Sequence, residues 1–403
     1  MRLRLFLLQG AITAGFFTFA CLLLIEAPPR VSKFFSKNEV DRCDNISILD
    51  TTFIYGSCPN NTYLRKPGPD YPSMIATTSC TDSAGGRIDC LYGQRVFNQN
   101  NYNTYLIGDS FIQAEEIEYS KSVYGLINNS KTSPYRNSYG FGFSSWNTRQ
   151  YLQAIKAINK KNSNYDIYLF ANDITPRFER STYGEVNRKT STSKKDFLLA
   201  VKRLLTRSIT VQKILQIRSK AAISPQLRKI RNDYWADHIN MSFDKCPTSK
   251  TKKNIDSFSP LMRDYIMYSY IYDCWDDTQK EAYYLVKEDL KQILYHGNLL
   301  NSKVRIILFP AGFSFSDENV PGRLVEDTYY IPSNLSLSLN GLREKLSVDF
   351  KNSIIDLEDL LDKEIKEYKK RCERDCSNAY YFGHDGHFTS RGHEFLYRTL
   401  YAK

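Results

Sequence analysis

Short apolar stretches alternate with helical patterns from residue 101 onward, and this alternation limits the fold more than any other feature of the sequence. Five stretches have the length and apolar character of strands: 104–107, a weaker one within 133–143, 166–171, 304–310 and 353–357. Helices are predicted at 113–124 and at 150–158, where apolar residues recur at helical spacing, and an acidic helix is predicted at 360–368, after the last strand. Strands that alternate with helices favour a parallel, doubly wound sheet. We therefore predict an α/β fold.

The segment between Asn172 and Val304 is too long to be a single crossover between two strands. A stretch at 194–220 has helical periodicity and many basic residues, and a second helical pattern runs from 277 to 295. We predict a helical insertion over about 181–300. Its basic residues suit contact with phospholipid or an acidic glycan, although a solvated helix face is the more common explanation of such charges.

An uncharged apolar run of 21 residues, Leu5–Ile25, has the length of a transmembrane helix. The residues that follow it make a poor cleavage site for a signal peptide, so we predict an uncleaved anchor. Arg2 and Arg4 precede the run, which favours a cytoplasmic N-terminus, whereas Arg30, Lys33 and Lys37 oppose that orientation. The predicted organisation has three parts: a cytoplasmic tip and anchor at 1–30, a cysteine-containing, loop-rich segment at 31–100, and the main domain at 101–403.

Cysteine usage fits the same topology. One of the nine cysteines, Cys21, lies in the apolar run, and the other eight are an even number outside it. Such a set favours disulfides in an oxidising compartment, although free buried thiols are the alternative. The pairing is not fixed by the sequence. The simplest local pairs are Cys80 with Cys90, Cys246 with Cys274, and Cys372 with Cys376.

The formal net charge of +11 indicates an anionic neighbour. A phospholipid surface, an acidic polysaccharide and nucleic acid are the candidates. No nucleic-acid-binding motif accompanies the charge, and the predicted anchor favours the first two. We therefore predict no nucleic-acid partner.

Gly108-Asp109-Ser110-Phe111 follows the first predicted strand of the main domain. Ligands and reactive groups collect at the carboxyl edge of a parallel sheet. A serine at the start of the next helix has an exposed hydroxyl group and a backbone N–H that can bind an anion, and acyl transfer needs both. A Gly-Asp-Ser turn that only caps a helix is the equally common alternative.

Asp385-Gly386-His387-Phe388-Thr389 lies near the C-terminus, after the last predicted strand. A nucleophilic serine needs a base of near-neutral pKa and a carboxylate that fixes its tautomer, and this turn carries both. The order Ser, Asp, His occurs in one known type of catalytic triad. A zinc site is an alternative that an oxidising compartment disfavours, and its ligands would be Cys372, Cys376, His384 and His387. We predict no metal and no cofactor.

Two further positions suit the stabilisation of an oxyanion. Gly142 lies in a glycine-rich turn, with Gly140 as the second choice, and Asn172 ends the strong strand at 166–171. A glycine N–H and an asparagine side-chain amide are both suitable donors to the oxygen of a tetrahedral intermediate. Each signal is weak alone, because glycine and asparagine are common in loops.

Taken together and in order, these blocks resemble the SGNH/GDSL hydrolase family. Gly-Asp-Ser-Phe at 108–111 is similar to its first block, Gly142 to the second, Asn172 to the third, and Asp385 with His387 to the last. The resemblance covers roughly 101–180 and 300–400. It implies a three-layer α/β/α fold with five parallel strands, Ser110 as nucleophile, and an oxyanion hole formed by Ser110, Gly142 and Asn172.

The last block departs from the usual spacing, because Asp385 precedes His387 by two residues and not three. An Asp-x-His followed by an aromatic residue is similar to branches that act on envelope polysaccharides, such as the alginate acetyltransferases. The resemblance therefore implies a membrane-anchored serine esterase or O-acyltransferase that acts on acyl, most simply acetyl, esters of a cell-envelope glycan. A membrane protein that donates the acyl group would be a partner of such an enzyme.

Two other functions remain open at this stage. One is a non-catalytic glycan-binding or assembly protein on the same fold, and the other is a lipase-like enzyme that acts on membrane lipids. We expect the catalytic domain to face the periplasm. The lumen of a secretory pathway is the alternative, and Asn-x-Ser/Thr sequons occur at Asn45, Asn60, Asn128, Asn240 and Asn334.

Overall fold

A computed structural model describes most of the main domain and parts of the segment before it. The described residues are 42–43, 56–57, 60–65, 76–82, 85–90, 103–130, 135, 137–144, 146–174, 243–256, 260–315, 338–372, 379–382 and 386–402. The predicted anchor and the basic stretch at 194–220 therefore lie outside the described residues. Within the described part of the chain, no helix is long and apolar enough to cross a membrane.

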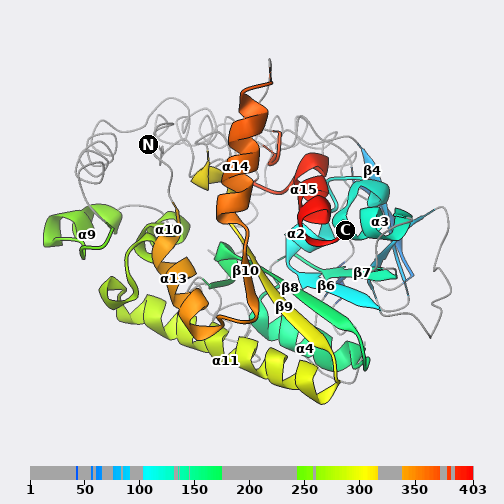
Figure 1. Ribbon diagram of the computed structural model, residues 1–403, viewed down its shortest axis with the longest axis horizontal. Helices are drawn as coiled ribbons and strands as arrows, with labels where there is room; N and C mark the ends of the chain where they lie inside the picture. The colour runs from blue at the N-terminus through cyan, green and yellow to red at the C-terminus, as the bar shows by residue number, and fades with distance from the viewer. Residues whose placement is uncertain are drawn as a thin grey trace, which may run out of the picture. The chain divides into compact units, whose positions relative to one another are not determined.

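An eight-stranded mixed sheet forms the centre of the protein, in the order β10-β9-β8-β6-β7-β5-β4-β3 (Figure 1). Five neighbouring strands are parallel: β10 (Ile354–Asp356), β9 (Lys303–Phe309), β8 (Asn164–Phe170), β6 (Thr104–Gly108) and β7 (Ser138–Gly142). These strands match the five predicted ones. All residues of β6 are buried, as are all but the first residue of β8, because helices cover both faces.

Three antiparallel strands extend this sheet beyond β7, so the prediction of a purely parallel, five-stranded sheet is corrected. The added strands are β5 (Arg87–Ile88), β4 (Thr77–Thr81) and β3 (Thr62–Arg65). They come from the segment predicted to be loop-rich, and β5 pairs with the strand edge that β7 would otherwise expose. A separate two-stranded pair is formed by β1 (Arg42–Cys43) and β2 (Gly56–Ser57).

Helices lie on both faces of the sheet, which gives a three-layer α/β fold (Figure 1). On one face, α3 (Val123–Asn129) packs against α15 (Ser390–Leu400), and α3 contacts β7. On the other, α4 (Thr148–Ile158) packs against α11 (Asp277–Leu299), and both contact the strands. The core between these layers is rich in tyrosine and phenylalanine.

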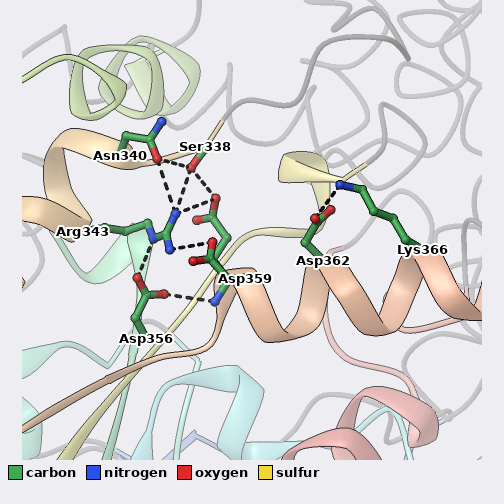
Figure 2. A network of polar contacts seen from close by, with 8 residues as sticks. Ser338, Asn340, Arg343, Asp356, Asp359, Asp362 and Lys366 are labelled. Atoms are coloured by element: carbon green, nitrogen blue, oxygen red, sulfur yellow. Dashed lines mark hydrogen bonds and ion pairs between the residues drawn. The ribbon is translucent and has the colours of Figure 1, made fainter. Parts of the chain in front are cut away.

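The remaining helices of the described regions lie in the connections between strands or after the last strand. The predicted insertion contains α9 (Ser249–Ile255) and α10 (Pro260–Ser269) as well as α11. The crossover from β9 to β10 contains α13 (Asn340–Asp349), and α14 (Glu358–Lys369) follows β10. Arg343 of α13 donates hydrogen bonds to Asp356 at the end of β10 and to Asp359 of α14, so one guanidinium group joins three elements (Figure 2).

The helix predicted over 113–124 is wrong. A single turn, α2 (Ser110–Gln113), ends where Ala114 adopts a left-handed conformation with φ of 50°. A 3-10 turn at Tyr119–Lys121 and then α3 follow. The side chains of Glu115 and Glu116 are buried between these short elements, which one continuous helix with a single apolar face would not allow.

Two of the three simplest disulfide pairs are present. Cys80 is bonded to Cys90, and Cys246 is bonded to Cys274. Cys372 is also disulfide-bonded, and its predicted partner Cys376 lies outside the described residues. The first disulfide lies at the added antiparallel strands, and the second joins the start of α9 to the turn before α11.

Candidate active site

Ser110 is the first residue of α2, directly after the carboxyl end of β6. Gly108 allows the sharp turn between the two elements, because a Cβ atom there would lie 2.6 Å from the side chain of Ile112. The Asp109 side chain caps α2 by accepting a hydrogen bond of 3.0 Å from the N–H of Phe111. The turn therefore presents the serine at the edge of the sheet where the sequence predicts a nucleophile.

His387 meets Ser110 across a sequence separation of 277 residues. Its Nε2 lies 2.7 Å from Ser110 Oγ, which is hydrogen-bonding distance. In the tautomer that carries its proton on Nδ1, Nε2 accepts the hydroxyl proton. The imidazole is half-buried and packs on Phe111, with ring centroids 4.8 Å apart. The structure thus brings the predicted nucleophile and base together in the geometry that proton transfer needs.

The backbone around His387 is held by a tight turn. Phe382 N–H donates to His387 O at 2.8 Å, and Gly386 N–H donates to Phe382 O at 3.0 Å. Gly386 has φ of 80°, a conformation that residues with a side chain rarely adopt. Tyr381 pairs with Phe388 as an isolated antiparallel bridge. These contacts fix the position of the base without using its side chain.

Asp385 and His384 lie outside the described residues, so the role of Asp385 as the carboxylate of the triad stays a prediction. No group of three or more His, Cys, Asp or Glu side chains in the described regions has the arrangement of a metal site. Cys372 is disulfide-bonded, and a disulfide sulfur is not the thiolate that zinc requires.

Gly142 lies beside the Ser110 turn, at the end of β7. It pairs with Gly108 in the sheet, and a Cβ atom on Gly142 would lie 2.5 Å from both Asp109 O and Gln113 N. Only glycine fits so close to the backbone of α2. Gly140 is different, because a Cβ there would overlap the ring of Tyr124 in α3. Gly142, and not Gly140, therefore lies where an oxyanion donor is predicted.

Asn172 follows β8 in a 3-10 turn at Ala171–Ile174 and has an exposed side chain. Burial raises the pKa of the Asp109 carboxyl to about 6, and a hydrogen bond from the Asn172 amide partly opposes that rise. The three predicted oxyanion residues therefore lie at the ends of the three adjacent strands β7, β6 and β8. Their role as donors to an oxyanion stays a prediction.

Three polar residues near the site were not predicted from the sequence. Gln113 accepts a hydrogen bond of 2.9 Å from the N–H of Ser144, which lies two residues after Gly142. Asp109 and Asp173 are carboxyl groups with only 1% of their surface exposed. Asp109 precedes Ser110, and Asp173 follows Asn172. The only sequence signal for them is that adjacency.

His393 is a structural histidine. It is buried in α15, where its Nδ1 accepts a hydrogen bond of 3.3 Å from the N–H of Val123. Burial, together with the nearby positive charges of Arg87 and His387, lowers the pKa of His393 to about 3. This histidine is therefore neutral at physiological pH and joins α15 to α3.

Comparison with known proteins does not identify a family or a function for the chain. No family model and no curated protein matches the sequence. Among solved structures, an extracellular lipase from Streptomyces rimosus is similar over 74% of this chain and 98% of its own, with 11% sequence identity and a TM-score of 0.32. This TM-score is below the level of a shared fold, so the function is argued from the site alone.

Proposed function

We propose that the chain is a serine ester hydrolase or O-acyltransferase in which Ser110 is the nucleophile. The observation that supports the proposal is the 2.7 Å contact between Ser110 Oγ and His387 Nε2 at the carboxyl edge of the parallel strands. A serine that only caps a helix has no need of an imidazole at its hydroxyl group. In support, the neighbouring turns carry Gly142 and Asn172, which are suitable donors for an oxyanion.

The reaction begins when His387 Nε2 takes the hydroxyl proton of Ser110 while Oγ attacks the carbonyl carbon of an ester. The carbonyl oxygen becomes an oxyanion, to which Ser110 N–H, Gly142 N–H and the Asn172 side chain donate hydrogen bonds. The proton on His387 then passes to the leaving alcohol, and an acyl-enzyme remains. Asp385 stabilises the imidazolium form between these steps.

The acyl-enzyme is resolved by a second hydroxyl group, from which His387 removes the proton. Water as the acceptor makes the chain an esterase, and a sugar hydroxyl makes it an O-acyltransferase. We propose an acyl ester of a cell-envelope glycan as the substrate, with the chain anchored by residues 5–25 and its catalytic domain outside the cytoplasm. This part rests on the sequence, through the apolar run and the Asp-x-His motif.

The test is covalent labelling of the full-length chain by a fluorophosphonate, a probe that reacts with activated serines. We expect Ser110 to carry the label in peptide mass spectrometry. Ser110→Ala should abolish labelling and p-nitrophenyl acetate hydrolysis, and His387→Gln should slow both at least about 1000-fold. Ser347→Ala, at an exposed position of α13, is the matched control and should behave as the wild type.

The possible results separate the functions. Labelling of Ser110 with turnover that rises when a glycan acceptor is added indicates a transferase, and labelling with turnover that the acceptor leaves unchanged indicates an esterase. A chain whose Ser110 reacts no faster than Ser347 is not a serine acyl enzyme, and a non-catalytic glycan-binding protein then becomes the better account.

A further inference from the structure

Two buried carboxyl groups lie next to the residues proposed for catalysis. Asp109 follows β6 and Asp173 follows β8, and these two strands are parallel neighbours. Burial raises the pKa of both carboxyls. The negative charge of Asp109 raises the pKa of Asp173 further, so each group lies within electrostatic reach of the other. Taking two negative charges out of water side by side is costly unless cations compensate them.

No lysine or arginine among the described residues forms an ion pair with either carboxyl. The titratable groups that face Asp109 are His387 and Asp173, and those that face Asp173 are Asp109 and Tyr151. Within the part of the chain that the structure describes, the pair therefore faces one group that can become cationic, His387, and it faces Asp109. This asymmetry decides which carboxyl holds a charge.

The hydrogen bonds to the two carboxyls are similar, so the charge of His387 is what distinguishes them. Asp109 accepts from Phe111 N–H, and the Asn172 amide also favours its charged form. At Asp173, Oδ2 accepts from Phe170 N–H at 2.8 Å and from the Tyr151 hydroxyl at 3.0 Å. Oδ2 of Asp109 and Oδ1 of Asp173 are both buried and have no hydrogen-bond partner within the described regions. An unpartnered oxygen costs less free energy on a neutral acid than on a carboxylate, which favours one charge over two, and His387 favours placing that charge on Asp109.

We propose that Asp109 and Asp173 carry one negative charge between them at neutral pH, located on Asp109, and that this charge stabilises the imidazolium form of His387. Asp173 stays a neutral acid that holds the end of β8 through Phe170 and Tyr151. Asp109 is a positioning residue, because it acts through His387 and not on the substrate. The proton of Ser110 still moves to His387 Nε2 and on to the leaving group, and neither aspartate takes it up.

The effect of Asp109 on catalysis rests on the proposed function, whereas the assignment of the negative charge to Asp109 does not. The test is therefore a nuclear magnetic resonance titration of His387 in the full-length chain, labelled at histidine Cε1. The His387 signal is assigned by its loss in His387→Gln. Asp109→Asn should lower the pKa of His387 by about one unit, because it removes a nearby negative charge. Asparagine is also a good helix cap, so the turn is kept.

Asp173→Asn is the matched control, because an amide replaces a neutral acid of the same shape. It should leave the pKa of His387 unchanged. An equal decrease in both variants would mean that Asp173 is charged, and no decrease in Asp109→Asn would mean that its charge does not reach His387. Either result overturns the proposal. The wild type offers a check without any substitution, since the absence of a protonated aspartate carboxyl signal at pH 7 overturns it as well.

The pH profile of ester hydrolysis supplies a second readout. A lower pKa of His387 moves the acidic limb of kcat/KM to lower pH in Asp109→Asn, whereas a purely structural role lowers the rate at every pH and leaves the limb in place. If Ser110→Ala hydrolyses the ester as fast as the wild type, the proposed function fails. The titration of His387 still decides where the charge lies.

Discussion

At the scale of single residues, the site depends on a close approach between two backbones, that of β7 at Gly142 and that of the turn that carries Ser110. Gly142 leaves no space for a side chain against Asp109 O and Gln113 N. This contact sets the distance between the end of β7 and the turn that carries Ser110. The sequence predicted Gly142 as a donor from its place in a glycine-rich turn, and the close approach supplies a physical reason for glycine that the sequence does not contain.

We expect Gly142→Ala to lower kcat for ester hydrolysis by about 100-fold, in the range seen when one oxyanion donor is lost. The added methyl group must push β7 away from α2, because the atoms that it meets belong to the backbone. Steady-state kinetics and fluorophosphonate labelling measure the effect. An increase in KM with unchanged kcat would show that Gly142 contributes to substrate binding only.

His393 should make stability depend on pH. Its folded-state pKa of about 3 lies below the unfolded value of about 6.5, so the unfolded chain binds a proton that the folded chain does not. The contribution is therefore fully present above pH 6.5 and is lost as the pH falls from there toward 3. Between pH 7 and pH 5 the loss is about 2 kcal/mol.

His393→Gln removes this term, so the difference in free energy of unfolding between variant and wild type should shrink by about 2 kcal/mol on going from pH 7 to pH 5. Urea denaturation at the two pH values measures it. Because other titrating groups are common to both proteins, they cancel in the difference. A difference that stays constant with pH would mean that His393 is protonated when folded.

At the scale of elements, the added antiparallel strands hold the irregular stretch that follows Ser110 and α2. Arg87 of β5 is buried and donates hydrogen bonds to the carbonyls of Ala114 and Ile117, the latter at 2.6 Å. These carbonyls lie in the irregular stretch where the sequence predicted a helix. One guanidinium group thus takes the place of the hydrogen bonds that a continuous helix would have made.

Arg87→Met should lower the free energy of unfolding by about 2 to 4 kcal/mol, because buried carbonyls lose their donors. We also expect a smaller kcat, since the end of α2 is no longer held. The measurements are urea denaturation and ester hydrolysis at a temperature where the variant is folded. Lys366→Met, at an exposed ion pair with Asp362, is the control and should cost less than about 1 kcal/mol.

A second buried cluster holds α15 against the sheet. Arg305 of β9 forms two hydrogen bonds of 2.7 and 2.6 Å with Asp166 of β8, and these residues are neighbours in the sheet. The hydroxyl of Tyr401, directly after α15, donates to Asp166 at 2.6 Å and lies 2.7 Å from the hydroxyl of Tyr168. The helix that follows His387 is therefore tied to the strands at its far end.

Asp166→Asn should cost about 3 to 5 kcal/mol of unfolding free energy, because it leaves the positive charge of Arg305 buried without its partner. The double variant Asp166→Asn with Arg305→Met should be less destabilised than Asp166→Asn alone. Urea denaturation of the single and double variants forms the test. If the two losses simply add, the pair is not coupled.

At the scale of the whole molecule, the parallel part of the sheet was predictable and the antiparallel part was not. β8 and β9 each end in a run of four apolar or aromatic residues, Ile-Tyr-Leu-Phe and Ile-Ile-Leu-Phe, as is typical of buried parallel strands. By contrast, β4 has the sequence Thr-Thr-Ser-Cys-Thr, and β5 has two residues. Their burial comes from pairing in the sheet, β5 with β7 and β4 with β5 and β3, and not from an apolar pattern.

The candidate site shows the same division. Ser110 and His387 lie in short motifs whose chemistry can be recognised, so the sequence predicted both. Asp109 precedes Ser110 and Asp173 follows Asn172, but their burial depends on how β6 and β8 pack, which no local pattern contains. The Ser110–His387 pair was thus predictable from sequence, whereas its electrostatic surroundings are a property of the folded sheet.

Removal of either of the two described disulfides, Cys80–Cys90 or Cys246–Cys274, should show how much each contributes to the stability of the fold. Loop-closure entropy predicts a loss of about 3.6 kcal/mol for Cys246→Ala with Cys274→Ala and about 2.7 kcal/mol for Cys80→Ala with Cys90→Ala, because the first pair closes the longer loop. Thermal unfolding of the two double variants tests the order. A greater loss for Cys80 with Cys90 would show that the added strands matter more than loop length.

Ser110 and His387 are 277 positions apart in the sequence, which has a consequence for the timing of any reaction at this site. During synthesis, the serine leaves the ribosome long before the histidine. A growing chain therefore carries the hydroxyl group without the imidazole through most of translation, and the two side chains meet only after the segment that contains His387 has folded onto α2. A nascent or truncated chain lacks the Ser110–His387 contact on which the proposed chemistry depends.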